Sequence, residues 1–240
     1  MEDGKYKVLL VIFLLSIIIM VIACFFMCTN LYMKSMKLRV SPLYEHSRVA
    51  GSDSCFWLIG DSRIARWNFS DTIAGCKTNN LGIEGQTAQQ VYYRLKLNLE
   101  EAKPKLVLIQ VGINDLKIIG LDEKNKLSII DKTVDSIISS LEICRSNEVK
   151  PIFSTIIPTG RIPLLRKLVW SNEIDKAIIE TNKRVVDYCV KNNIMVFNAY
   201  EILKNDHNKL NRVFEFDELH INVAAYSLLL DNLNRILNNK

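Results

Sequence analysis

The segment Cys55-Phe56-Trp57-Leu58-Ile59-Gly60-Asp61-Ser62 is the stretch that decides the fold. Its first five residues form a short apolar run, and Gly60 ends that run. A short apolar run bounded by a glycine is typical of a strand that is buried on both faces of a parallel sheet. We therefore expect a buried strand over residues 55–59, with Asp61 and Ser62 in the loop at its carboxyl end.

Strands and helices alternate through the rest of the chain. We expect strands at 78–81, 105–111, 151–157 and 194–197, and helices that begin at Thr87 and span 124–146, 172–191 and 222–238. Parallel strands need long crossover connections, which these helices supply. The pattern predicts an α/β fold, a flavodoxin-like three-layer α/β/α sandwich whose five-stranded parallel sheet has the order 2-1-3-4-5.

Two further strands are each followed by glycines and polar residues. Gly82-Ile83-Glu84-Gly85 follows the second strand, and Gly112-Ile113-Asn114-Asp115 follows the third. In open parallel sheets, ligands bind outside the carboxyl ends of the strands, near the point where the strand order reverses. Since the first strand lies between the second and the third, this topology is expected to bring Ser62, Gly85 and Asn114 together.

A serine hydroxyl becomes a useful nucleophile only when a base takes its proton, so the three histidines are candidates for that base. His46 lies between the apolar N-terminal run and the first strand, and His207 lies in a polar run. His220 alone has a carboxylate, Asp217, three residues before it. Such a carboxylate can accept the Nδ1–H of the ring and fix its tautomer. We therefore expect His220 to be the base for Ser62.

Taken in order, these segments resemble the four sequence blocks of the SGNH hydrolases, also called GDSL esterases/lipases. The blocks are Gly60-Asp61-Ser62, Gly85, Gly112-Ile113-Asn114-Asp115 and Asp217-Glu218-Leu219-His220. Each block alone is a weak signal, whereas all four in this order form a specific one. The resemblance spans roughly residues 55 to 225.

The resemblance implies a role for each of five residues. Ser62 is the nucleophile, His220 the base, and Asp217 the acid that orients the base. The backbone N–H groups of Ser62 and Gly85 and the side-chain amide of Asn114 form the oxyanion hole. Such donors are preset where negative charge develops, and losing one costs roughly 10²–10³ in rate. The family implies no metal and no cofactor.

Three positions near these blocks refine the resemblance. Asn222 and Tyr226 match the family's usual continuation after the histidine. Arg63 stands where the GDSL name expects leucine, and it would put a positive charge near the site. The G-x-S-x-G elbow of the α/β-hydrolases is absent from the sequence, which disfavours that rival serine-hydrolase fold.

Other polar and glycine positions in the blocks have simpler interpretations. Asp61 and Asp115 are expected to be acceptors that stabilise turns, and Gly82 is expected to be a turn glycine. Glu218 has no role that the sequence assigns.

Composition narrows the class of protein further. Lys and Arg outnumber Asp and Glu by 31 to 26, a mild bias spread along the chain. Nucleic-acid binders cluster their basic residues on one face or in a recognisable module, so we expect no nucleic-acid partner. The six cysteines form no C-x-x-C pair and have no histidines at zinc-ligand spacing, so we expect no metal site. The sequence does not decide whether any of them form disulfides.

An uncharged apolar run over residues 8–28 matches the ~20 residues that cross the hydrocarbon core as a helix. It has no polar face at any helical period, which disfavours a buried core helix. A signal peptide, or a lipoprotein cleavage box at Val21-Ile22-Ala23-Cys24, is the alternative, but the apolar run continues beyond that box. We predict one N-terminal transmembrane helix as a membrane anchor at 1–33, a linker at 34–54 and an SGNH hydrolase domain at 55–240.

Two arguments disagree about orientation. The basic residues after the apolar run outnumber those before it, which by the positive-inside rule favours a cytoplasmic domain. Anchored members of the resembled family often work on the envelope side of the membrane. We give the family more weight and expect a single-pass membrane protein with an extracytoplasmic catalytic domain.

The connection over residues 158–170 is longer than most, which is typical of a lid or a binding loop. Its basic and apolar residues suit an acyl chain, a membrane surface or an acidic glycan. The packing of an extra helical turn explains Leu164, Leu165 and Leu168 equally well, so both interpretations stay open.

Together these features predict a membrane-anchored serine esterase that works through an acyl-serine intermediate. Its partner is an ester-bearing glycan or lipid substrate, such as the acetyl esters of an envelope polysaccharide or lipid esters. Two alternatives stay open. One is an SGNH-type O-acyltransferase acting on a glycan, and the other is a catalytically inactive, membrane-tethered interaction module.

Overall fold

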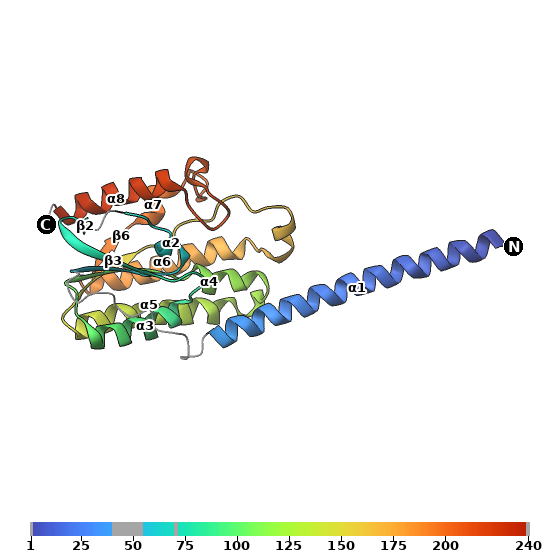
Figure 1. The fold of residues 1–240 in the computed structure, drawn as a ribbon, viewed down its shortest axis with the longest axis horizontal. Helices are drawn as coiled ribbons and strands as arrows, with labels where there is room; N and C mark the ends of the chain where they lie inside the picture. The colour runs from blue at the N-terminus through green and yellow to red at the C-terminus, as the bar shows by residue number, and fades with distance from the viewer. Residues whose placement is uncertain (1, 40–54, 70–71, 239–240) are drawn as a thin grey trace. The chain divides into compact units, whose positions relative to one another are not determined.

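The computed structural model describes residues 2–39, 55–69 and 72–238, and the chain divides into two compact units, residues 1–41 and 42–240 (Figure 1). The first unit is helix α1 (Glu2–Arg39). Its segment Lys5–Cys28 has a mean hydropathy of 3.4 and is long and apolar enough to cross a membrane, a property that signal sequences share. The helix continues through residues 34–39 of the expected linker, whereas 40–54, with His46, lie outside the described residues.

The second unit is built on a six-stranded sheet with the order β2-β3-β1-β4-β5-β6. The strands are β1 (Phe56–Gly60), β2 (Thr72–Ile73), β3 (Cys76–Gly82), β4 (Leu106–Gln110), β5 (Lys150–Ser154) and β6 (Met195–Phe197). The five predicted strands are parallel and have the predicted order. The predicted count was one short, because β2 pairs antiparallel with β3 at the sheet edge and is too short to show a periodic pattern.

Helices connect the strands and cover both faces of the sheet. The α-helices are α2 (Ser62–Ala65), α3 (Ala88–Glu101), α4 (Ile113–Leu116), α5 (Lys126–Ser146), α6 (Glu173–Lys191), α7 (Ala199–Leu203) and α8 (Val223–Asn238). The 3₁₀ turns are η1 (Lys117–Gly120), η2 (Glu123–Asn125), η3 (Leu165–Val169) and η4 (Arg212–Phe214). Helix α3 begins after Thr87, as predicted, and with a capping box, since Thr87 and Gln90 each accept a backbone N–H from the other.

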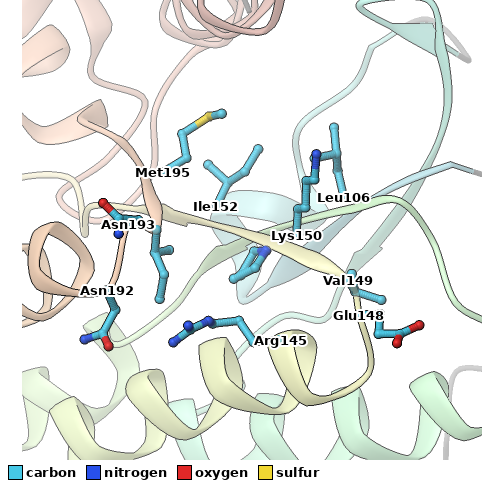
Figure 2. Close-up of a pocket in the computed structure, with 11 residues that line it drawn as sticks. Leu106, Arg145, Glu148, Val149, Lys150, Ile152, Asn192, Asn193 and Met195 are labelled. Atoms are coloured by element: carbon cyan, nitrogen blue, oxygen red, sulfur yellow. The ribbon is translucent and has the colours of Figure 1, made fainter.

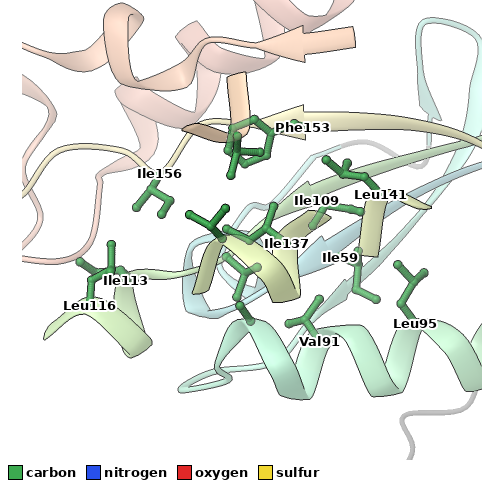
Figure 3. Close-up of a cluster of buried hydrophobic side chains, with 14 of the residues drawn as sticks. Ile59, Val91, Leu95, Ile109, Ile113, Leu116, Ile137, Leu141, Phe153 and Ile156 are labelled. Atoms are coloured by element: carbon green, nitrogen blue, oxygen red, sulfur yellow. The ribbon is translucent and has the colours of Figure 1, made fainter. Parts of the chain in front are cut away.

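Alternating side chains of the central strands supply two separate hydrophobic cores. In β1, Trp57 and Ile59 belong to the core under α3, α5 and α6, part of which Figure 3 shows. Phe56 and Leu58 belong to the core under α7 and α8 on the other face. Strand β1 is therefore apolar throughout, because both of its faces are buried. These layers are visible in Figure 1, where α3 and α5 lie on one side of the sheet and α8 on the other.

A disulfide joins Cys55, just before β1, to Cys76, the first residue of β3. Both residues lie at the amino ends of neighbouring parallel strands, where Cys55 N also donates to Lys77 O at 3.0 Å. The bond thus closes the end of the sheet opposite to the loops that carry Ser62 and Gly85.

Candidate active site

Three side chains form one hydrogen-bonded line at the carboxyl end of β1. Ser62 Oγ lies 3.0 Å from His220 Nε2, and His220 Nδ1 lies 2.7 Å from Asp217 Oδ2. These are the three catalytic residues that the sequence predicts, brought together from positions 158 residues apart. A carboxylate on Nδ1 leaves Nε2 as the ring atom that can accept a proton from the serine hydroxyl.

The turn between β1 and α2 presents Ser62 at the end of the strand. Gly60 ends β1, and Asp61 is the N-cap of α2, with Oδ1 accepting the Arg63 N–H at 3.0 Å. Asp61 therefore has the turn-stabilising role that the sequence indicates. Ser62 begins α2 and is largely buried, so the neighbouring loops hold its hydroxyl in a fixed environment.

Asp217 shapes the loop that carries His220. Its Oδ1 accepts the backbone N–H groups of Leu219 and His220, each at 2.8 Å, while Oδ2 contacts the imidazole ring. Burial raises the pKa of Asp217, but the bonds from the ring and from the two backbone N–H groups outweigh burial and lower it. Asp217 is thus held as a carboxylate against the ring.

The loops after β3 and β4 lie beside the Ser62 turn, as the strand order predicts. Ile83 N donates to Gly60 O at 3.0 Å, and Asn114 Nδ2 donates to Gln86 O at 3.0 Å. Gly85 has a φ of +75°, which explains why a glycine stands there. Gly82 packs directly on α2, because a Cβ added to it would lie 2.1 Å from Ala65 N.

The amide of Asn114 is fixed in one orientation by two partners that cannot exchange roles. Lys117 Nζ, which only donates, contacts Asn114 Oδ1 at 2.7 Å. The carbonyl of Gln86, which only accepts, receives Asn114 Nδ2. A flipped amide would lose both bonds. Lys117 was not predicted from the sequence, although its position three residues after Asn114, on one helical face, was a usable signal.

A buried guanidinium, that of Arg94, is hydrogen-bonded to the loop after β3. Arg94 on α3 donates from Nε at 3.1 Å and from Nη2 at 2.7 Å to Gln86 Oε1. Burial lowers the pKa of Arg94 to about 10, so it stays cationic at neutral pH. Gln86 therefore links Arg94 to Asn114, through its side chain on one side and its backbone carbonyl on the other. The sequence analysis assigned a role to neither Gln86 nor Arg94.

The side chain of Arg63 places a positive charge near Asp61 and Asp217, as expected from the sequence, but that charge does not face solvent. It is buried, with Nε donating to Leu219 O at 2.9 Å and Nη1 to Ile157 O at 3.1 Å. Burial lowers its pKa to about 10. The sequence could not show which way this side chain points. Arg63 thus connects the turn that carries Ser62 to the loop that carries His220.

Helix α8 is hydrogen-bonded to the turn that carries Ser62. Tyr226 donates its hydroxyl to Arg63 O at 2.8 Å, and Asn222 Oδ1 accepts the Ala225 N–H at 3.1 Å. Asn222 Nδ2 also donates to Val213 O at 2.8 Å. Asn222 and Tyr226 thus make structural contacts around residues 215–222, the loop that carries Asp217 and His220. We call this loop the catalytic loop.

Two further carboxyls are buried near the site. Burial raises the pKa of Asp61, and it raises the pKa of Asp115 to about 7. Asp115 Oδ2 accepts the Ala88 N–H at 2.9 Å, so it joins the Asn114 loop to the start of α3. Its acceptor role is the one expected, but the segment that it stabilises is the first turn of α3.

Glu218 connects the catalytic loop to the long connection over residues 158–170. Its carboxylate pairs with Arg166, and its backbone carbonyl accepts the Gly160 N–H at 3.0 Å. Thr159 O in turn accepts the Leu210 N–H at 2.9 Å. His207 makes no part of this arrangement, and lies exposed in the turn before Leu210.

A pocket of about 560 Å³ lies at the other end of the domain (Figure 2). It is lined by the first residues of β4, β5 and β6, namely Leu106, Lys150 and Met195, together with Arg145 and Asn192. Ser62 lies two residues after Gly60, the last residue of β1, and parallel strands all end at the same edge of a sheet. This pocket is therefore separate from the candidate catalytic residues.

The chain is similar in sequence and in fold to known proteins. Residues 58–228 match the model of the GDSL-like Lipase/Acylhydrolase family. A putative acylhydrolase from Bacteroides fragilis superposes with a TM-score of 0.64 at 21% identity, covering 81% of this chain and 91% of that one. A GDSL-like lipase from Bacteroides thetaiotaomicron gives 0.64 at 20% identity, with 88% and 97% covered.

An acetylxylan esterase from Geobacillus stearothermophilus has a TM-score of 0.59 at 17% identity, with 77% of this chain and 94% of that one covered. Among curated proteins, the N-acylneuraminate cytidylyltransferase of Escherichia coli O18:K1:H7 is 24% identical over 181 residues. That region is 75% of this chain but 39% of the relative, so the chain spans well under half the length of that protein.

Proposed function

Because the chain belongs to the GDSL-like lipase/acylhydrolase family, and is thus an SGNH-type hydrolase of ester bonds, we propose that it cleaves a carboxylic ester through an acyl-serine intermediate on Ser62. The observation that carries this proposal is the hydrogen-bonded line from Ser62 through His220 to Asp217. A serine, a base and an orienting acid in contact are the parts that nucleophilic acyl transfer requires.

The geometry supports a two-stage reaction. His220 Nε2 takes the Ser62 proton as Oγ attacks the ester carbonyl, and Asp217 stabilises the imidazolium that forms. The same ring then gives its proton to the leaving alcohol. In the second stage His220 takes a proton from the water that attacks the acyl-serine, and it returns that proton to Ser62 Oγ as the acid leaves. The backbone N–H groups of Ser62 and Gly85 and the Asn114 amide are the proposed oxyanion donors.

We propose that the substrate is an ester carried by a glycan or a lipid. Structural relatives with GDSL-like lipase and acetylxylan esterase names support both classes. The partial similarity to a protein named N-acylneuraminate cytidylyltransferase, whose name contains that of a sugar acid, adds support to the glycan class. The acyl group that the site accepts distinguishes the two.

A series of aryl esters of increasing acyl length tests the activity and the class together. Turnover confined to acetyl esters supports glycan deacetylation, and turnover that rises with chain length supports lipid esters. Ser62→Ala is the matched control, because the change removes only the hydroxyl. Turnover by Ser62→Ala equal to that of the wild type would refute the proposed nucleophile.

We also propose that α1 anchors the protein and that the catalytic domain is extracytoplasmic. The length and apolarity of Lys5–Cys28 support the anchor. The Cys55–Cys76 disulfide supports the orientation, because structural disulfides persist mainly in oxidising compartments. Protease added to intact cells should degrade an extracytoplasmic domain. A domain that is degraded only after the membrane is opened would reverse the proposed orientation.

A further inference from the structure

The long connection over residues 158–170 exposes its leucines instead of packing them. Leu164, Leu165 and Leu168 are 78%, 81% and 74% exposed. The alternative that these side chains pack an extra helical turn is therefore wrong. Leu165 and Leu168 lie three residues apart in the 3₁₀ turn η3, a spacing that places both on one side of the turn. We call these three residues the leucine rim, and the whole connection over residues 158–170 the rim segment.

The leucine rim is fastened to the catalytic loop. Arg166, within the rim segment, pairs with Glu218, which lies two residues before His220. Arg161 N donates to Glu215 Oε1 at 3.2 Å. Phe216, in the same catalytic loop, is a further large apolar side chain with 70% exposure. The rim segment and the catalytic loop lie at the same end of the domain (Figure 1).

Exposed basic residues lie on the rim segment and beside it. Arg161 and Lys167 are exposed on the rim segment, and Arg212 is exposed before the catalytic loop. The acidic side chains of Asp175, Glu215 and Glu218 accept hydrogen bonds from this segment. Exposed leucines flanked by exposed Lys and Arg are the composition of segments that lie in the membrane interface, where anionic headgroups attract the cations.

We propose that the leucine rim docks on the surface of a lipid bilayer and holds the mouth of the active site against it. The proposal rests on the anchor proposed above, which would keep the rim within reach of a membrane. It also gives the basic residues a partner of opposite charge. Substrates would then be esters presented at the membrane surface, because the docked rim adjoins the loop that carries His220.

The test uses the full-length protein reconstituted in vesicles of phosphatidylcholine and phosphatidylglycerol, with bromine atoms on the shallow acyl carbons. Bromine quenches tryptophan fluorescence at short range. Leu165→Trp puts the probe on the rim. Val190→Trp is the matched control, since Val190 is 69% exposed on the last turn of α6, which leads to the amino end of β6.

Docking predicts that brominated lipid quenches the added fluorescence of Leu165→Trp more strongly than that of Val190→Trp. Equal quenching of the two would overturn the proposal. Flotation after an alkaline wash reports the anchor separately: protein that leaves the vesicles would refute the anchor and the docking with it. Fluorophosphonate labelling of the same samples reports the catalytic serine, so its failure is distinguishable from both.

A second pair of measurements separates docking from direct binding of an acyl chain. The double variant Leu165→Ser with Leu168→Ser should hydrolyse an ester embedded in vesicles several-fold more slowly than the wild type. Its turnover of a soluble acetyl ester and of a soluble long-chain ester should be unchanged. An equal loss on the soluble long-chain ester would mean that the rim binds the acyl chain, which would overturn the proposal.

Discussion

Arg63 Nε donates a hydrogen bond to Leu219 O at 2.9 Å, so the residue after the proposed nucleophile contacts the residue before the proposed base. The backbone carbonyl of Arg63 also accepts the Tyr226 hydroxyl. Ser62 and His220 therefore keep their separation through neighbours that are bonded to each other, as well as through their own contact. A supporting layer of this kind is what catalytic geometry requires, because small displacements of reacting groups cost rate.

Arg63→Met should reduce both stability and activity. The change leaves the buried carbonyls of Leu219 and Ile157 without this donor, at a cost on the order of 2–5 kcal/mol in the free energy of unfolding. Urea unfolding in detergent and kcat/KM on an aryl acetate measure the two effects. Arg66→Met is the control, because Arg66 pairs with Glu84 at the exposed surface, where such pairs contribute about 1 kcal/mol or less. Equal losses in the two variants would contradict the role of Arg63.

Lys117→Met should lower kcat with a smaller change in KM. Without the Lys117 ammonium, the Asn114 amide can rotate, and the proposed oxyanion donor is no longer preset. We expect a loss of roughly 10-fold in kcat, less than the loss of the donor itself in Asn114→Ala. Lys117→Arg keeps a donor and should recover part of the rate. A rise in KM with kcat unchanged would show that Lys117 binds substrate instead.

Asp217→Asn should cost less turnover than His220→Ala. The asparagine variant keeps a proton acceptor at position 220 but loses the carboxylate that fixes its tautomer, whereas His220→Ala removes the acceptor. Steady-state turnover and fluorophosphonate labelling rates measure both variants. Equal rates of turnover and labelling in the two variants would refute the assignment of His220 as the base.

Asp115→Asn should flatten the dependence of stability on pH. Burial raises the pKa of Asp115 to about 7, above the value of about 4 of an unfolded chain. Between these values the native state binds the extra proton, so this residue makes stability fall as the pH rises through that window. Asparagine keeps an oxygen for the Ala88 N–H and does not titrate. We therefore expect a smaller loss of unfolding free energy from pH 5 to pH 8.

The control for that measurement is Asp135→Asn, which changes an exposed carboxylate on α5. Its unfolding free energy, measured by urea at the same two pH values, should follow that of the wild type. If the free energy of unfolding of Asp115→Asn depends on pH as that of the wild type does, then Asp115 is ionised at both pH values and the prediction is wrong.

The sequence predicted the parallel strands and long helices because their apolar patterns are periodic. Residues 105–111 contain β4, and 124–146 contain α5, since burial repeats along each segment. β2, α2, α4 and α7 were not predicted, because elements of two to five residues are too short to show a period. Their positions depend on contacts with distant segments.

Some residues of the candidate site could likewise be predicted from the sequence, and others could not. Ser62, Asp217 and His220 are recognisable because their chemistry restricts residue type and local spacing. Gln86 and Arg94 act through bonds between loops and helices, for which no local spacing rule exists. The direction of the Arg63 side chain depends on where Leu219 and Ile157 lie, and only the folded chain shows that.

The central claim is that Ser62 is a nucleophile activated by His220, and covalent labelling tests it most directly. Full-length protein in detergent is treated with a fluorophosphonate probe, and peptide mass spectrometry locates the adduct. We predict one adduct on Ser62, none in Ser62→Ala, and strongly slowed labelling in His220→Ala. Folded wild-type protein that is left unlabelled, or an adduct on another residue, would contradict the claim.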